Sequence, residues 1–164
     1  RDLHSFPTRR SSDLNAGLIL RRVMNPDATL TLIDPFVPDS ISAMRGSYRI
    51  SRIVVNREQR GRVQFFREFS YHVAKQWSTP VDFVFIDGDH SEQACRRDFE
   101  DWSQYVQPGG VILFHDSRKD QPPEQPWMGA NGSTAVVNNL FRKQQHPHWR
   151  IVDEGGSIVA VQRV

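Results

Sequence analysis

Two apolar runs of strand length stand out in the hydropathy pattern, and ionisable side chains follow each of them. The residues that follow the runs at 81–86 and 111–114 are Asp87, Asp89, His90, His115 and Asp116. Between the runs, apolar side chains recur at helical spacing at Cys95, Phe99, Trp102 and Val106. This order predicts two buried parallel strands joined by a crossover helix. Because open α/β sheets bind ligands at the carboxyl ends of their strands, we expect the chemistry at 87–90 and 115–116.

The rest of the pattern alternates between strands and helices. The predicted strands are 29–33 and 63–67, and the predicted helices are 16–24, 40–60, 70–77 and 133–144. Ser70 is expected to cap its helix with its hydroxyl. A tight turn at 154–156 between two apolar runs predicts a terminal antiparallel hairpin. The Pro- and Gly-rich segment 117–132 predicts a long loop of the kind that covers active sites.

Residues 1–14 differ from everything that follows them. They have no apolar periodicity, and they resemble the translation of a common sequencing-library adapter. We therefore expect a non-native segment at 1–14, excluded from the fold, and a partial domain at 15–164 whose natural start is lost. A disordered basic tail is the alternative.

Charge and composition exclude several classes of protein. The formal net charge is +2 at pH 7, and basic residues are scattered rather than clustered, so no nucleic-acid surface is expected. No apolar run approaches the ~18–20 residues that cross a membrane. The single cysteine, Cys95, lies on the apolar face of its helix, which favours packing over nucleophilic chemistry. One unpaired cysteine is also typical of the cytoplasm.

Three carboxylates end predicted strands and are candidates for binding. Asp34 follows an early strand, where an acid can accept hydrogen bonds from ribose hydroxyls, with capping of the turn at Pro35 as the equally weighted alternative. Asp87 and Asp116 end neighbouring strands and could share a divalent cation such as Mg²⁺. His115 would be a third ligand, better suited to manganese, iron or zinc. Each of these residues alone would be an ordinary turn or cap residue.

His90 is the candidate general base. An unperturbed imidazole titrates near neutrality, which suits proton abstraction at physiological pH. The alternative is a histidine that only caps the helix opening at Ser91.

At several points these residues resemble the class I S-adenosylmethionine-dependent methyltransferases. The matching features are Asp34 after its strand, Phe65-Phe66 with Ser70, the run 81–90 ending Ile-Asp-Gly-Asp-His, and the run 108–116 ending His-Asp. The resemblance covers about residues 15–164. It implies an α/β fold, a Rossmann-like, doubly wound, mostly parallel sheet of seven strands whose last strand is antiparallel.

The resemblance also implies roles for individual residues. Asp34, Ser70 and Asp87 would contact S-adenosylmethionine, Asp87, His115 and Asp116 would hold the divalent metal, and His90 would be the base. The chain departs from the family at two places. His115 stands where the family's metal-dependent members carry a carboxylate. No glycine-rich loop precedes Asn15, so we expect the first strand and its loop to be missing and an apolar edge to be exposed in the sheet centre.

The expected function is methylation of a hydroxyl on a small molecule or saccharide, with S-adenosylmethionine as methyl donor. A divalent ion would lower the pKa of the hydroxyl, and His90 would take its proton. The alternatives are a metal-dependent hydrolase and a non-catalytic nucleotide-binding domain. The expected partners are small molecules, without nucleic acid or membrane, in the cytoplasm. Assembly into a homo-oligomer is compatible with the sequence.

Overall fold

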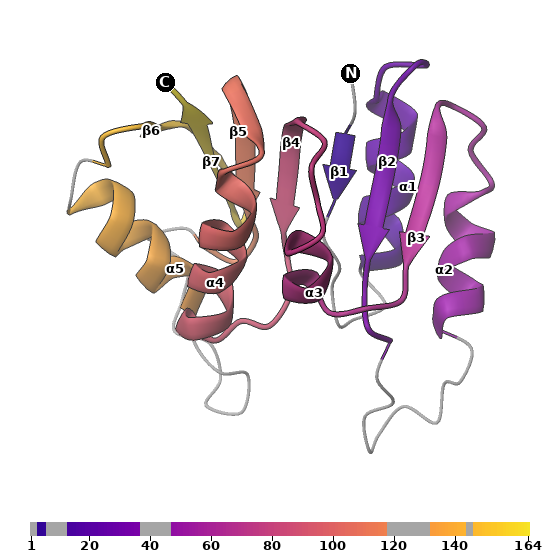
Figure 1. Ribbon diagram of the computed structural model, residues 1–164, viewed down its shortest axis with the longest axis horizontal. Helices are drawn as coiled ribbons and strands as arrows, with labels where there is room; N and C mark the ends of the chain where they lie inside the picture. The colour runs from indigo at the N-terminus through magenta and orange to yellow at the C-terminus, as the bar shows by residue number, and fades with distance from the viewer. Residues whose placement is uncertain (1–2, 6–12, 37–46, 118–131, 144–145) are drawn as a thin grey trace.

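The computed structural model describes residues 3–5, 13–36, 47–117, 132–143 and 146–164 (Figure 1). Its strands are β1 (Leu3–Ser5), β2 (Thr29–Ile33), β3 (Arg62–Phe66), β4 (Val81–Ile86), β5 (Val106–Phe114), β6 (Trp149–Gly155) and β7 (Ile158–Arg163). Its helices are α1 (Asp13–Val23), α2 (Ser47–Val55), α3 (Ser70–Ala74), α4 (Glu92–Ser103), α5 (Gly132–Val137) and the π-helical turn η2 (Asn138–Arg142).

The seven strands form one sheet in the order β3-β2-β1-β4-β5-β7-β6. The first five strands of this order are parallel, and β7 pairs antiparallel with both β5 and β6. This confirms the predicted α/β Rossmann-like sheet with an antiparallel last strand and a terminal hairpin. The order reverses between β1 and β4, and ligands of open α/β sheets bind at that kind of reversal.

The centre of the sheet differs from the expectation. Residues 3–5 form β1, which pairs with β2 through Leu3↔Leu30 to Ser5↔Leu32 and with β4 through Leu3↔Phe83. The central position is therefore occupied, although 1–14 was expected to lie outside the fold. Strand pairing uses backbone groups, and a stretch of three residues shows no periodicity by which a sequence pattern could reveal it. The sequence between β1 and α1 contains no glycine, as expected.

Two apolar clusters cover the sheet. The larger is built from β2 and β4–β7 with α3, α4, α5 and η2. It includes Cys95, Phe99 and Trp102 of the predicted helical stripe, whose fourth member, Val106, begins β5 instead of lying in the helix. The smaller cluster joins α1, α2 and β2 around Met24, Ala28, Leu30 and Val55. Helix α1 contacts α2, whereas α4 contacts α3 and α5, so the helices form two separate sets.

The bounds of α3 and β5 are among those that differ from the predicted ones. Helix α3 begins at Ser70, its N-cap is Phe69, and no side chain caps it, so the predicted capping role of Ser70 is wrong. Strand β5 begins at Val106 and includes Pro108–Gly110, which the β4–β5 register accommodates through an irregularity between Val81 and Phe83. Proline and glycine are tolerated at such irregular strand positions because the ladder is interrupted there.

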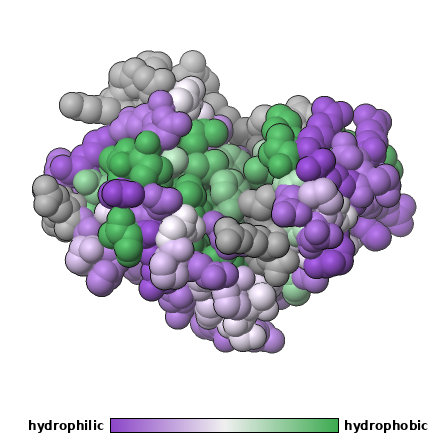
Figure 2. Space-filling model, turned by 90° about the horizontal axis from the view of Figure 1, so that it is seen from above, coloured by the Kyte–Doolittle hydropathy of each residue, from purple (hydrophilic) through white to green (hydrophobic). Residues whose placement is uncertain are grey.

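The surface also differs between the two halves of the sheet. Figure 2, seen from above Figure 1, shows hydrophobic residues gathered on the side of α4, α5 and β5–β7, and hydrophilic ones over α2 and β3. Within the described part of the chain, no helix is long and apolar enough to span a bilayer.

Candidate functional site

The carboxyl ends of β4 and β5 bring the predicted chemistry together. Ile86 and Phe114 are paired in the parallel ladder, and the backbone N–H of His115 donates to the carbonyl of Ile86 at 3.0 Å. The residues that follow each strand therefore lie side by side. This edge faces downward in Figure 1.

Four of the predicted residues form one group, which we call the acid–imidazole cluster: Asp87, His90, His115 and Asp116. Nδ1 of His115 lies 2.8 Å from Oδ1 of Asp87 and 3.4 Å from Oδ2 of Asp116. Nδ1 of His90 lies 3.5 Å from the same Oδ2 of Asp116. The side chain of Asp87 is only 7% exposed, whereas that of His90 is 28% exposed. The cluster thus has a buried acid at its base and an imidazole that a ligand can reach.

Local hydrogen bonds fix the turn that carries His90. Oδ1 of Asp89 accepts from the backbone N–H of Ser91 at 2.9 Å, and Oγ of Ser91 accepts from the N–H of Ala94 at 3.2 Å. Ser91 is therefore the N-cap of α4. His90 does not cap this helix, so its imidazole is left for the cluster.

The backbone of Asp116 adopts a left-handed conformation, with φ of 48°. This conformation is uncommon outside glycine, although aspartate and asparagine tolerate it best. The next residue, Ser117, is fully buried, donates its N–H to the carbonyl of Ser157 at 3.0 Å and donates its hydroxyl to the carbonyl of Phe114 at 2.7 Å. The β7 end and the turn before it thus hold Asp116 in a geometry that directs its carboxylate toward both histidines.

The geometry does not support the metal site predicted at Asp87, His115 and Asp116. Among the residues that the structure describes, no group of three or more histidine, cysteine, aspartate or glutamate side chains is arranged to hold an ion. Nδ1 of His115 instead approaches both carboxylates. Binding of a metal by Asp87, His115 and Asp116 therefore stays a prediction.

Asp34 lies at the carboxyl end of β2, on the same edge of the sheet but beyond β1. Its N–H donates to the carbonyl of Phe66 at 3.0 Å, and its Oδ1 accepts from the N–H of Phe36 at 2.6 Å. The turn-capping alternative is therefore realised through Phe36, whose φ is 48°. Binding of ribose by Asp34 stays a prediction.

The hydroxyl of Ser70 faces the interior. Its Oγ accepts from Nε1 of Trp102 at 2.8 Å. It also hydrogen-bonds the side chain of Asp98, whose pKa burial raises to about 6 while the Ser70 contact opposes the rise. The structure thus joins Ser70 to Trp102 and Asp98, and contact of Ser70 with the cofactor stays a prediction.

Two residues that the sequence did not single out bond to the cluster from α5. The N–H of Gly132 donates to the carbonyl of His90 at 3.1 Å, and Oγ1 of Thr134 donates to the carbonyl of Asp116 at 3.2 Å. Both contacts join segments far apart in the chain, so no local motif could have indicated them. The predicted loop between these segments falls on 118–131, outside the described residues.

Cys95 has the packing role that its position predicted. It is 1% exposed, and burial raises the pKa of its thiol to about 12. A thiol in that state is a poor nucleophile.

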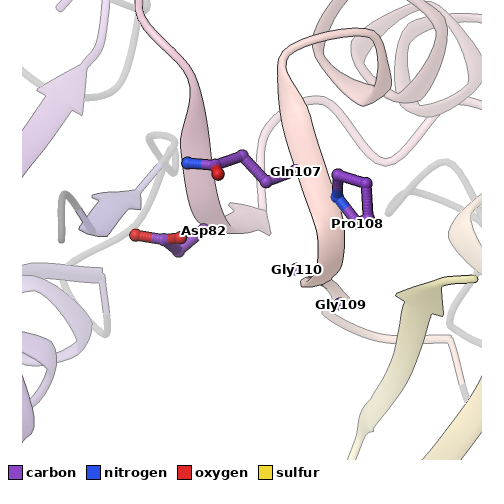
Figure 3. Close-up of a pocket in the computed structure, with 5 residues that line it drawn as sticks. All are labelled: Asp82, Gln107, Pro108, Gly109 and Gly110. Atoms are coloured by element: carbon purple, nitrogen blue, oxygen red, sulfur yellow. The ribbon is translucent and has the colours of Figure 1, made fainter.

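A hollow of about 370 Å³ lies at the opposite edge of the sheet (Figure 3). It is lined by Asp82, Gln107, Pro108, Gly109 and Gly110, at the amino ends of β4 and β5. The acid–imidazole cluster lies at the carboxyl ends of the same strands, so this hollow is separate from the candidate site.

Comparison with known proteins agrees with this arrangement. The O-methyltransferase TomG of Streptomyces achromogenes, solved in complex with SAM (S-adenosylmethionine), superposes with a TM-score of 0.69 at 14% identity, covering 99% of this chain and 73% of TomG. An O-methyltransferase of Bacillus cereus in complex with SAH gives a TM-score of 0.63 at 18% identity, covering 99% and 74%. At such identities the likeness shows the fold.

Sequence comparison gives the family. A stretch of 59 residues is 37% identical to an uncharacterized protein of Acanthamoeba polyphaga mimivirus and covers 33% of this chain but only 27% of the viral protein. Residues 14–117 match the family described as methyltransferase domain, and this match includes Asp34 and the whole acid–imidazole cluster. The chain therefore belongs to this family of methyltransferases, with the class I, S-adenosylmethionine-dependent fold.

Proposed function

We propose that this protein transfers a methyl group from S-adenosylmethionine to a hydroxyl oxygen of a small molecule or saccharide. The observation that carries the proposal is the convergence of His90, His115, Asp87 and Asp116 at the carboxyl ends of β4 and β5. The similar O-methyltransferases from Streptomyces achromogenes and Bacillus cereus support a hydroxyl acceptor.

The proposed cofactor position runs along the edge from Asp34 to Asp87. The half-buried carboxylate of Asp34 would accept the ribose hydroxyls, beside the exposed aromatic side chains of Phe66 and Phe69. Aromatic faces of this kind suit a purine ring. Asp87 and Ser70 are the other proposed contacts, and the orientation of the Ser70 hydroxyl toward Trp102 makes it the least favoured of the three. When bound, the cofactor supplies a methyl group on a positively charged sulfur, which accepts an electron pair as the methyl leaves.

His90 acts as the general base in this proposal. With Asp116 at 3.5 Å from Nδ1, the favoured tautomer carries the hydrogen on Nδ1 and leaves the lone pair on Nε2. Nε2 takes the proton of the acceptor hydroxyl while the oxygen forms its bond to the methyl carbon. Proton, methyl group and electron pair are then balanced, because the imidazole gains the positive charge that the sulfur loses.

No step passes through a metal. Nδ1 of His115 lies 2.8 Å from Oδ1 of Asp87 and 3.4 Å from Oδ2 of Asp116, so in this proposal an imidazole stands between the two acids. An N–H group near the acceptor oxygen can also stabilise negative charge as it develops.

The test combines binding with turnover. Calorimetry with S-adenosylmethionine should show binding that Asp34→Ala weakens about tenfold or more, since a charged hydrogen-bond acceptor is worth roughly 1.5–3 kcal/mol. Mass spectrometry on a panel of catechols, sugars and phenols should then detect products one methylene heavier. His90→Gln should lower kcat about 10²–10⁴-fold while binding of the cofactor is kept.

The other outcomes separate the alternatives. Cofactor binding without any methylated product would favour a non-catalytic binding domain. Hydrolysis products that appear only with added metal would favour the hydrolase. Unchanged turnover in His90→Gln would remove His90 from the role of base.

A further inference from the structure

We propose that the first turn of α5 is the positioning device of the site, with Gly132 and Thr134 setting the geometry between His90 and Asp116. The inference rests on the proposed function, in which these two side chains work as a pair. Neither Gly132 nor Thr134 needs to touch the substrate, because each bonds to the backbone of a residue that does the chemistry.

The first observation is a pair of hydrogen bonds from one helical turn to two different loops. The N–H of Gly132 donates to the carbonyl of His90 at 3.1 Å. Two residues later, Oγ1 of Thr134 donates to the carbonyl of Asp116 at 3.2 Å. The turn after β4 and the turn after β5 are thus both hydrogen-bonded to the first turn of α5, one through its backbone and the other through a side chain.

The second observation is the absence of space for any side chain at Gly132. A Cβ atom there would lie 2.1 Å from the carbonyl oxygen of His90, 2.3 Å from the amide nitrogen of Glu92 and 2.3 Å from the carbonyl carbon of Ser91. All three are backbone atoms, so no rotamer change relieves the collision. Even a methyl group must push α5 away from the turn that carries His90.

The third observation is the strained backbone of Asp116. Its φ is 48°, and the peptide between Asp116 and Ser117 is held by two hydrogen bonds, from the Thr134 hydroxyl to the Asp116 carbonyl and from the Ser117 N–H to the Ser157 carbonyl. Without the Thr134 bond the Asp116 peptide is free to relax toward the right-handed region, which would rotate its carboxylate away from His90. The 3.5 Å separation between Oδ2 of Asp116 and Nδ1 of His90 therefore depends on a residue outside the cluster.

The experiment compares Thr134→Val with Thr134→Ser and Gly132→Ala with Gly155→Ala. Valine keeps the shape of threonine but removes the hydroxyl, whereas serine restores it. Gly155 is the matched glycine control, since a Cβ atom there meets nothing within 4 Å. The main measurement is the side-chain nitrogen chemical shifts of His90, which report its tautomer and need neither cofactor nor acceptor.

We expect Thr134→Val and Gly132→Ala to move the His90 shifts toward a mixture of tautomers, while Thr134→Ser and Gly155→Ala leave them at the wild-type values. Once an acceptor is known, Thr134→Val should lower kcat about ten- to a hundredfold with the cofactor Kd unchanged, the size expected for misplacement by about 1 Å.

The outcomes of this experiment are independent of the proposed activity. If His90 shifts move in Thr134→Val and return in Thr134→Ser, the positioning role holds even where no methylated product is found. If Thr134→Val folds and gives wild-type His90 shifts, the proposal is wrong. If Gly132→Ala does not fold, the comparison of Thr134→Val with Thr134→Ser still tests the proposal.

Discussion

The two halves of the sheet are stabilised in different ways. The half with β4, β5, β7 and α3–α5 contains all but one of a cluster of eighteen buried residues, the exception being Ile33 of β2, and carries the acid–imidazole cluster at its edge. The half with β2, β3, α1 and α2 has a cluster of four, and apolar side chains such as Ile19, Val23 and Ile53 are exposed on its helices. Reactive groups therefore stand on the more extensively packed half, where the supporting side chains have little freedom.

The smaller half uses polar contacts in place of a large core. The guanidinium of Arg21, 5% exposed, donates to the carbonyls of Arg60, Val55 and Gly61 at 2.9, 3.0 and 3.3 Å and to Oδ1 of Asn56 at 2.9 Å. One buried side chain thus ties α1 to the end of α2 and to the turn before β3. The comparison predicts which substitutions lower stability most in each half. In the half with β4 and β5 they are truncations of apolar side chains, and in the half with β2 and β3 they are losses of polar contacts.

The largest effect is expected for Trp102→Ala in the larger cluster. Trp102 is fully buried, packs edge-on against Trp77 with ring centroids 5.5 Å apart, and donates to Ser70. The free energy of unfolding should fall by about 3–5 kcal/mol, measured by urea denaturation. Met24→Ala, at a similarly buried site in the smaller cluster, should cost about 2 kcal/mol. Equal costs for the two variants would contradict the difference between the halves.

The second effect is expected for Arg21→Met. Methionine keeps much of the arginine stem but leaves the buried acceptors around it without their donor, so the free energy of unfolding should fall by about 2–3 kcal/mol. Arg22→Met is the matched control, because its ion pair with Glu58 is 3.9 Å long and its side chain is 61% exposed. That control should change stability by less than about 0.5 kcal/mol. A similar loss in both variants would show that the network around Arg21 contributes little.

A third, smaller effect is a pH dependence from Asp98. Burial raises the pKa of this carboxyl from 3.8 to about 6, so the folded protein holds the proton in a range where the unfolded chain has lost it. The stability contributed by the protonated form is present below pH 3.8 and is lost as the pH rises through about 6. Asp98→Asn should therefore gain about 1–2 kcal/mol near pH 8 and nothing near pH 4. Urea titrations at both pH values would measure this, and an equal gain at both would contradict it.

The smallest effect is expected for metal removal. Because His115 already contacts both acids, dialysis against EDTA should leave cofactor affinity and methyl transfer unchanged. Turnover measured before and after dialysis, and again with added Mg²⁺ or Mn²⁺, checks this. If dialysis lowers turnover and either ion restores it, the result would support a metal site at the carboxyl ends of β4 and β5.

Much of the fold could be predicted from the sequence where the signal is local. Strands 29–33 and 81–86 match the structure because each is a short, mostly apolar run, and the stripe from Cys95 to Trp102 matches because its apolar residues recur at helical spacing. The convergence of the acid–imidazole cluster also followed from parallel strand order alone. Strand β1 could not be predicted, because a strand of three residues is too short to show a periodic pattern.

What the sequence could not reveal depends on long-range geometry. The spacing of Asp87, His115 and Asp116 is compatible with a metal site, but the sequence could not reveal that Nδ1 of His115 lies within 3.4 Å of both carboxylates. Ser70 was assigned to a helix cap, whereas its hydroxyl bonds to Trp102, 32 residues away. Gly132 and Thr134 bond to backbone carbonyls in other loops, contacts that leave no local pattern.

The shortness of β1 has a mechanical consequence. Leu3–Ser5 of β1 connect the two halves of the sheet by strand pairing. All three residues pair with β2, but only Leu3 pairs with β4. β1 lies between β2, which is followed by Asp34, and β4, which is followed by Asp87. A small molecule that contacts both Asp34 and Asp87 would connect the two halves of the sheet across β1. The bound protein should therefore resist proteases and heat better than the free protein, and the gain should increase with ligand concentration.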